Sequence, residues 1–214
     1  MRYGKDHKQA TRERIVEAAG RRFKEDGIDG AGVAALMSDA GLTNGAFYGH
    51  FSSKDDLVGN VLADQLRSQR QLFDAQPQGR AGLEAIVHLY LSPEHRDQWA
   101  DGCPSAALLE EIGRGPDATR EIYSDELMAM VDDIVRRLGR SDSEVARADA
   151  LVVFGLLAGT LQFARTLTDR DLSDRLLARG VETALKLLDD SNRSTVTPDR
   201  CECNACLSLQ PARE

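Results

Sequence analysis

The segment that most constrains the fold of this chain is residues 33–57, VAALMSDAGLTNGAFYGHFSSKDDL. Apolar residues from 33 to 40 indicate one helix, Gly41 suits the left-handed backbone of a tight turn, and Thr43 stands where a hydroxyl can cap a second helix. Apolar side chains would lock the two helices together and against the preceding helix: Phe23, Leu36, Ala40, Leu42, Phe47 and Phe51. The pattern predicts a helix-turn-helix.

The outer face of the second helix carries side chains that are short, polar or flat. They are Thr43, Asn44, Gly45, Ala46, Tyr48 and His50. Such residues let a backbone lie deep in a major groove, offer an amide to a base edge and place a methyl group against thymine. Ser53 and Asp56 then read as a capping box for a long helix, whose first residue Lys54 would clamp a phosphate. We therefore expect double-stranded DNA as a partner.

The rest of the chain predicts an all-α protein. Apolar residues recur at helical spacing before Gly27 and from Lys54 to Pro77, and further helices are expected across 82–92, 104–113, 117–138, 143–168 and 171–190. With the helix-turn-helix this makes about nine helices and no sheet. We expect a three-helix DNA-binding domain at 1–53, a ligand-binding and dimerisation domain at 54–190, and a polar tail at 191–214.

Charge is unevenly distributed along the chain. The net charge is −8, yet the first 24 residues hold eight basic and three acidic residues, a balance of +5, so the remainder carries −13. Either the basic end approaches phosphate while the acidic body stays away, or these residues are the solvated faces of a helix. The longest apolar run, residues 150–164, is shorter than the ~20 residues of a membrane span. Without a secretory leader pattern, we expect a cytoplasmic protein and no membrane partner.

The helix-turn-helix segment resembles the DNA-binding domain of TetR-type regulators over about residues 8–60. The resemblance rests on AGLTNGAFYGHFSSKDDL, preceded by RIVEAAGRRFKEDGIDG. It implies phosphate contacts from Thr43, Tyr48, His50 and Lys54, base reading by Asn44, Gly45 and Ala46, and backbone contacts from Lys8 and Arg12. The chain departs from the family at Ala31 and Gly32, where a capping Thr or Ser is usual, and at Gly49, which is frequently aromatic.

The same resemblance implies a homodimer on a near-palindromic operator. The family uses its last two large helices as the dimer interface, and the chain permits this because helix 143–168 is apolar nearly all round. Gly155 and Gly159 would let a second helix approach closely, and helix 171–190 adds a leucine-rich stripe. The expected interface is a symmetric four-helix bundle.

A small-molecule effector is expected within the middle helices of the second domain. Candidate walls are aromatic or sulfur-containing: Tyr90, Trp99, Cys103, Tyr123, Met128, Met130, Phe154 and Phe163. Each of them is equally compatible with an ordinary core position. Because few charged residues fall on those faces, a mainly apolar or aromatic ligand is expected.

The cysteines allow two interpretations each. Cys103, before Pro104, would cap a helix whose dipole stabilises a thiolate, as in TetR-type repressors that sense electrophiles; alternatively it is a small residue that fits a tight turn. Cys201, Cys203 and Cys206 have spacings usable for a soft metal, or are incidental in a polar tail. No metal site and no cofactor is predicted.

These features predict a DNA-binding transcriptional repressor released from its operator by a small apolar or electrophilic effector. An enzyme is disfavoured, because the sequence contains no Ser/His/Asp order, no phosphate-binding glycine loop and no His-x-x-x-His pair. A nucleoid-organising DNA binder would share the helix-turn-helix but bind many sites without ligand control.

Overall fold

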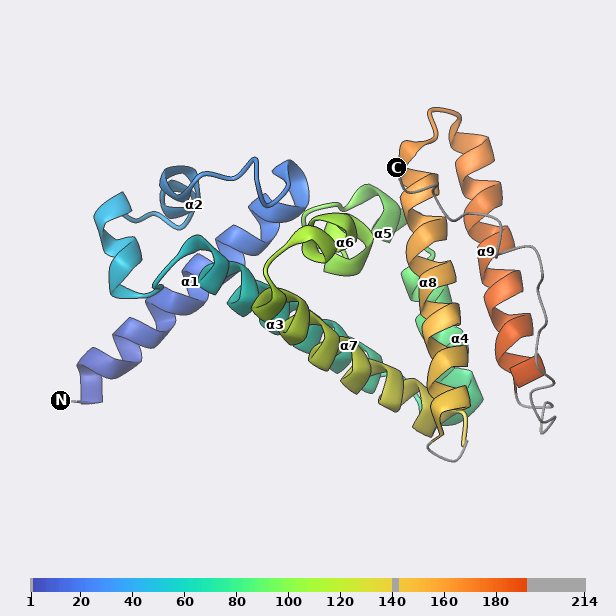
Figure 1. Cartoon of the computed structure of the whole chain (residues 1–214). Coiled ribbons are helices and arrows are strands. Elements are labelled where there is room, and N and C mark those ends of the chain that lie inside the picture. Colours follow the sequence, from blue (N-terminus) through green and yellow to red (C-terminus); the bar gives the residue numbers. More distant parts are fainter. Residues whose placement is uncertain (1, 140–142, 192–214) are drawn as a thin grey trace, which may run out of the picture.

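The computed structural model describes residues 2–139 and 143–191 (Figure 1). Within these ranges the chain is helical and contains no strand. The elements, in order, are α1 (Arg2–Asp26), α2 (Val33–Asp39), the 3-10 helix η1 (Asn44–Gly49), α3 (Lys54–Asp74), α4 (Gly79–Tyr90), α5 (Pro93–Asp97), α6 (Pro104–Arg114), α7 (Asp117–Arg137), α8 (Glu144–Thr166) and α9 (Arg170–Ser191). The predicted all-α fold is confirmed. The part of the predicted tail at 192–214 lies outside the described residues.

Two elements differ from the expectation. The sequence did not predict α5, a single turn that begins with Pro93 and is capped by Ser92, whose hydroxyl accepts a hydrogen bond from His95 N. The second helix of the helix-turn-helix is a 3-10 helix, consistent with the low helix propensity of Gly45 and Gly49. Thr43 occupies the N-cap position of η1 as predicted, but its side chain makes no capping hydrogen bond.

The N-terminal core forms around the predicted apolar residues. Phe23, Leu36, Phe47 and Phe51 are buried together with Ile15. The turns between these helices use glycine in the left-handed region, with φ of +80° at Gly27 and +67° at Gly41. As expected for a helix without a capping hydroxyl, α2 begins after Gly32 with no side-chain cap.

Helix α3 joins the two halves of the molecule. Its first turns bury Leu57, Leu62 and Leu66 in the N-terminal core, and its last turn buries Phe73 in the C-terminal core. It packs along α7, as Figure 1 shows. The buried guanidinium of Arg137 on α7 holds the C-terminal end of α3. Its Nη2 donates to Phe73 O at 2.9 Å, and its Nη1 donates to Pro77 O at 2.6 Å.

The C-terminal core lies between α4 and helices α6 to α9. Helices α8 and α9 run side by side at the end of the molecule opposite α2 and η1 (Figure 1). Their backbones approach closely at Gly180, where a Cβ would lie 2.7 Å from Thr160 Cγ2. The opposite face of α8 is open, and Val145, Val152 and Phe163 are exposed there. No helix among the described residues combines the length and apolarity that crossing a membrane requires.

Candidate DNA interface and effector cavity

Adjacent residues of η1 differ sharply in exposure. Phe47 is fully buried in the N-terminal core, whereas the Tyr48 side chain is 75% exposed. The two rings meet edge to face, with their centroids 5.2 Å apart. Thr43, Asn44 and Gly45 are also exposed, and Ala46 is half-buried against the core. The structure therefore gathers the predicted base-reading group and Tyr48 on one rigid, outward-facing turn.

The start of α3 lies next to this turn and is capped by its own side chains. Ser53 Oγ accepts a hydrogen bond from Asp56 N at 3.0 Å, as predicted. The Asp56 carboxylate bonds back to Ser52 rather than to Ser53, accepting from Ser52 N at 2.9 Å and Ser52 Oγ at 3.0 Å. The Ser52 N–H donation lowers the Asp56 pKa. Lys54 is the first residue of α3 and is half-buried.

The predicted contacts from α1 differ from each other. Lys8 is exposed, whereas Arg12 is engaged within the protein. Its Nη2 donates to Asn60 Oδ1 at 2.7 Å, and its guanidinium lies 4.3 Å from the centroid of the Phe51 ring. Arg12 thus ties α1 to α3, while its Nη1 is buried without a hydrogen-bond partner.

His50 closes η1 and is half-buried. Burial lowers its pKa, and the positive charges of Lys8 and Arg12 lower it further. The imidazole is therefore neutral at physiological pH. A neutral ring can still donate one hydrogen bond to a phosphate, but it adds no charge to the contact.

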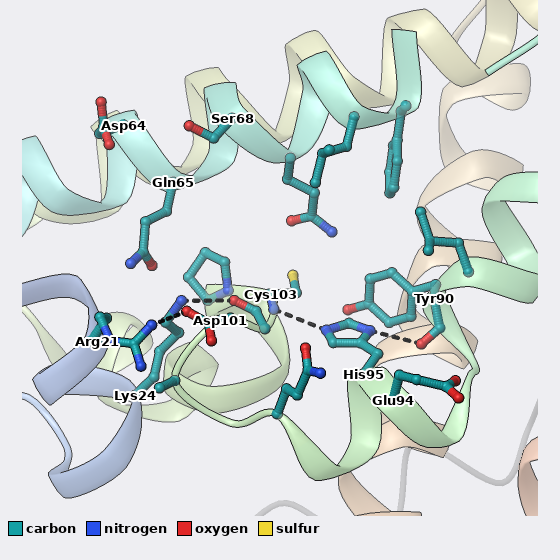
Figure 2. A pocket seen from close by; sticks show the side chains of 18 of the residues that line it. Arg21, Lys24, Asp64, Gln65, Ser68, Tyr90, Glu94, His95, Asp101 and Cys103 are labelled. Atoms are coloured by element: carbon teal, nitrogen blue, oxygen red, sulfur yellow. Dashed lines mark hydrogen bonds and ion pairs between the residues drawn. The ribbon is translucent and has the colours of Figure 1, made fainter. Parts of the chain in front are cut away.

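A cavity of about 430 Å³ lies where α1 meets the C-terminal half of the chain (Figure 2). Helix α1 contributes Val16, Glu17, Arg21 and Lys24, and α3 contributes residues between Asp64 and Phe73. The remaining wall comes from the end of α4, from α5 and from the segment that leads into α6, including Tyr90, His95 and Cys103. The DNA-binding half and the C-terminal half therefore share one cavity.

Two side chains of α1 contact the segment before α6, which forms the opposite wall of this cavity. Lys24 Nζ donates to Gly102 O at 2.9 Å, and Arg21 forms an ion pair with Asp101 (Figure 2). Lys24 is only 7% exposed, and this burial lowers its pKa to about 8.

A third connection, on α6, reaches the loop after α1. The Glu111 carboxylate accepts hydrogen bonds from Ile28 N at 2.8 Å and from Asp29 N at 3.2 Å. The end of α1 is therefore anchored both to the segment before α6 and to α6 itself.

His95 fixes the geometry of the cavity wall. Its Nδ1 donates to Tyr90 O at 2.7 Å, and its Nε2 accepts from Cys103 N at 3.0 Å, which assigns the neutral tautomer with the proton on Nδ1 (Figure 2). Burial lowers the His95 pKa, in agreement with this assignment. The histidine links the end of α4 to the start of α6.

The structure distributes the predicted pocket residues differently from the expectation. Tyr90 and Cys103 line the cavity. Phe154 and Met130 are buried in the C-terminal core, Met128 packs against it, and Tyr123 lies in the N-terminal core with its hydroxyl donating to Ser105 Oγ. Trp99 and Phe163 are exposed, at 45% and 69%.

Polar walls of this cavity were missed by the sequence analysis. The sequence pattern favours aromatic and sulfur-containing residues of the second domain, whereas α1 supplies charged side chains from the first. The expectation of few charges around the ligand therefore does not describe this cavity.

The cysteine predictions have separate outcomes. Cys103 is the N-cap of α6 with Pro104 at the first helical position, as predicted, and it is 4% exposed. Cys201, Cys203 and Cys206 lie outside the described residues. Within the described ranges, no three His, Cys, Asp or Glu side chains are grouped so as to hold a metal ion.

Comparison with known proteins agrees with this arrangement. Residues 15–61 match the family model of bacterial regulatory proteins, tetR family. The HTH-type transcriptional regulator TtgR of Pseudomonas putida is 41% identical over 66 residues, which are 31% of this chain and 31% of that protein. The HTH-type transcriptional repressor Rv1474c of Mycobacterium tuberculosis is 29% identical over 163 residues, covering 72% of this chain and 83% of that protein.

A solved structure matches most of the fold. The reduced form of E. coli NemR has a TM-score of 0.69 and 18% identity, covering 82% of this chain and 95% of that one. With an exposed helix-turn-helix on a larger helical body, the chain is similar to helix-turn-helix transcriptional regulators. Residues 15–61 therefore belong to the tetR family of bacterial regulatory proteins.

Proposed function

We propose that the chain is a sequence-specific repressor that binds a near-palindromic operator as a homodimer and leaves it when a small molecule binds. The observation that carries the DNA-binding part is the outward-facing turn η1, with Tyr48 75% exposed above a fully buried Phe47. Apart from its edge contact with Phe47, most of this aromatic side chain is open to solvent. It is free to contact a phosphate, a sugar or a base.

The proposed dimer uses the open face of α8. Val145, Val152 and Phe163 lie on this face, and a Cβ at Gly155 or Gly159 would meet nothing within 4 Å. Exposed apolar residues at helical spacing with glycines between them suit close packing against a second helix. Two copies related by a two-fold axis would place their η1 turns on half-sites about 34–36 Å apart.

The cavity between α1 and the C-terminal half supports the effector part of the proposal. A molecule in that space would press against Lys24 of α1 and against the segment around Gly102, which are hydrogen-bonded to each other. If the ligand binds better when these walls separate, it shifts α1 and the attached helix-turn-helix away from the DNA-bound spacing. Ligand binding then lowers operator affinity.

Binding-site selection tests the DNA-binding proposal. The purified full chain would select sites from random duplex DNA at near-physiological salt. We expect one near-palindrome bound by a dimer, and about tenfold weaker binding of that site by Tyr48→Ala. Leu109→Ala, which removes an exposed apolar side chain from α6, is the control and should leave affinity unchanged. Recovery of no motif would contradict a specific regulator and favour a nonspecific DNA binder.

An electrophilic effector remains part of the proposal, because Cys103 lines the cavity. At 4% exposure, the thiol is reached only by a reagent small enough to enter that space. We expect Cys103→Ser to keep operator binding and to lose release by a small electrophile such as N-ethylmaleimide. Unchanged release from the Cys103→Ser protein would remove Cys103 from the mechanism.

A further inference from the structure

Among the described residues, Lys24 carries a buried ammonium, 7% exposed. Its Nζ makes one hydrogen bond, to Gly102 O, and no carboxylate of the described residues lies within ion-pair distance. Asp101, the carboxylate that acts on the Lys24 ammonium, is exposed and paired with Arg21. A buried ammonium that bonds only a neutral carbonyl retains two donor hydrogens and an uncompensated charge. Because Lys24 lines the cavity, both are available to a ligand that fills it.

Other polar groups in the same cavity also lack partners. The Tyr90 hydroxyl is buried and has no partner at hydrogen-bonding distance, with the weakly hydrogen-bonding Cys103 thiol as a neighbour. Gln65 Oε1 and Gln69 Oε1 are likewise buried and unpartnered. Buried polar groups are normally satisfied, so these three lining side chains would be stabilised if an occupant let them turn towards it and form hydrogen bonds.

Gln65 and Lys24 lie together. The Gln65 amide extends over α1, where a Cβ at Gly20 would lie 2.0 Å from Gln65 Nε2, and Lys24 is one helical turn further along α1. Figure 2 shows the Gln65 amide and the Lys24 side chain on the same end of the cavity. Because the oxygen and nitrogen of a glutamine amide exchange by a simple flip, Gln65 can donate a hydrogen bond toward the same point as Lys24.

The other walls are apolar or exposed. Leu72, Phe73 and Leu89 line the cavity, and Leu72 and Leu89 remain 60% and 47% exposed in the empty site. The acidic lining residues Glu17, Asp64, Glu94 and Asp101 are exposed, so water screens them more than it screens Lys24. The cavity therefore pairs one buried cation with an apolar surface, in a volume suited to a small molecule.

We infer that this cavity binds a small amphiphilic acid, with its carboxylate against Lys24 and Gln65 and its apolar body along Leu72, Phe73 and Leu89. This rests on the proposed function, for which it names the class of effector. The carboxylate competes with Gly102 O for Lys24 Nζ, and it thereby loosens the contact between α1 and the segment before α6. The effector thus acts directly on a helix of the DNA-binding half.

Calorimetry with three matched eight-carbon probes tests the ligand class. Octanoate, octanamide and octylamine share one apolar body and differ in the head group. We expect the full-length protein to bind octanoate about tenfold or more tightly than the other two. Equal affinity for octanoate and octanamide would overturn the role of the charge. Preference for octylamine would assign recognition to the acidic rim instead and would equally overturn the proposal.

Substitution of the cavity residues locates the head group. Lys24→Gln should reduce octanoate affinity about tenfold while octanamide affinity changes little. Gln65→Leu, which leaves every charge in place, should reduce octanoate affinity by a smaller factor. Lys186→Gln makes the first change at an exposed lysine of α9 and should have no effect. Full octanoate affinity in Lys24→Gln and Gln65→Leu would place the carboxylate elsewhere.

Proton uptake gives a readout that a purely structural lysine would not produce. The charged and titratable groups that act on Lys24 are Arg21, His95, Asp101, Cys103 and Arg165. A carboxylate beside Nζ raises the Lys24 pKa from about 8, so binding at pH 8.5 should take up a fraction of one proton. Titrations in buffers of different ionisation enthalpy measure this uptake. The proposal predicts uptake by the wild type and none by Lys24→Gln; the same uptake by both proteins would contradict it.

The two proposals fail separately. A protein that selects a palindromic site but does not prefer octanoate is still a specific regulator, and only the ligand class is wrong. A protein that binds octanoate through Lys24 but selects no DNA site retains the acid site and loses the proposed repressor function.

Discussion

At the scale of single residues, Phe47 and Tyr48 show how one short turn can anchor itself in the core and still expose a side chain for contact with DNA. Phe47 contributes a fully buried ring to the core, and Tyr48, the next residue, is 75% exposed. The buried ring fixes the backbone, so the exposed ring loses little backbone freedom when it meets DNA. The same division holds at His50 and Phe51, where a half-buried neutral imidazole precedes a buried ring.

The cap of α3 makes a residue-scale prediction about stability. Ser53 Oγ accepts from Asp56 N, which would otherwise be an unpaired amide of the first turn. Ser53→Ala should lower the free energy of unfolding by about 1 kcal/mol. Urea unfolding of the two proteins measures the difference. Ser68→Ala, an exposed position in the interior of the same helix, serves as the control and should not destabilise.

A second residue-scale prediction concerns pH. The buried Arg96 hydrogen-bonds Asp97 and lowers the pKa of that carboxyl to about 2, from an ordinary value of 3.8. A lowered folded-state pKa means that the stabilisation by Asp97 is complete above about pH 4 and is lost as the pH falls towards 2. Asp97→Asn should therefore be less stable than the wild type at pH 6, and the gap should narrow at pH 3. Urea midpoints at both values test this; a gap that widens at pH 3 would refute it.

At the scale of elements, the contact between α8 and α9 depends on a glycine. A Cβ at Gly180 would lie 2.7 Å from Thr160 Cγ2 and 2.9 Å from Leu91 Cδ1. Gly180→Ala gains about 1 kcal/mol of helix propensity, but overpacking a core contact costs about 1–3 kcal/mol, so we expect a net loss of stability. Gly113→Ala makes the same change in α6, where nothing lies within 4 Å, and should stabilise. Thermal unfolding should shift in opposite directions; shifts of equal sign would contradict the packing argument.

The elements also show what the sequence can predict. Helix ends marked by local chemistry were predicted well, such as the turn at Gly41 and the start of α6 at Pro104, because the deciding interactions lie within a few residues. The single turn α5 and the 3-10 form of η1 were not, since six or fewer residues carry too little periodicity.

The cavity was the largest omission, for a physical reason. Lys24 was counted with the basic N-terminal residues that would face phosphate, yet it is buried against Gly102, 78 residues away in sequence. Charge and helical period show that a residue is polar and on which face it lies. They do not show which distant segment covers that face. The sequence therefore predicts Tyr90 and Cys103 as lining residues but not the residues of α1 that line the same cavity.

At the scale of the whole molecule, helix α1 contributes both to the cavity and to the contacts beside the candidate DNA interface. Helix α1 contributes Arg12 to the contact with α3 beside η1, and it contributes Arg21 and Lys24 to the cavity. Glu111 of α6 holds the loop that leads from α1 to α2. Under the proposed function, a shift at the cavity would be transmitted through α1 and the Glu111 carboxylate.

The proposed repressor binds its operator as a homodimer, so the last prediction concerns the dimer interface. Phe163 is 69% exposed on the open face of α8, and a charged residue there leaves the folded chain intact because the side chain has no packing role within it. In a symmetric interface the same change occurs twice, and Phe163→Glu brings two carboxylates towards each other in a desolvated contact. We expect this variant to be monomeric by light scattering, to keep its helical circular dichroism, and to bind the selected palindrome far more weakly. Leu109→Glu introduces the same charge at an exposed position of α6 and should stay dimeric. If Phe163→Glu remained a dimer with full operator affinity, the subunits would have to meet through a face other than that of α8.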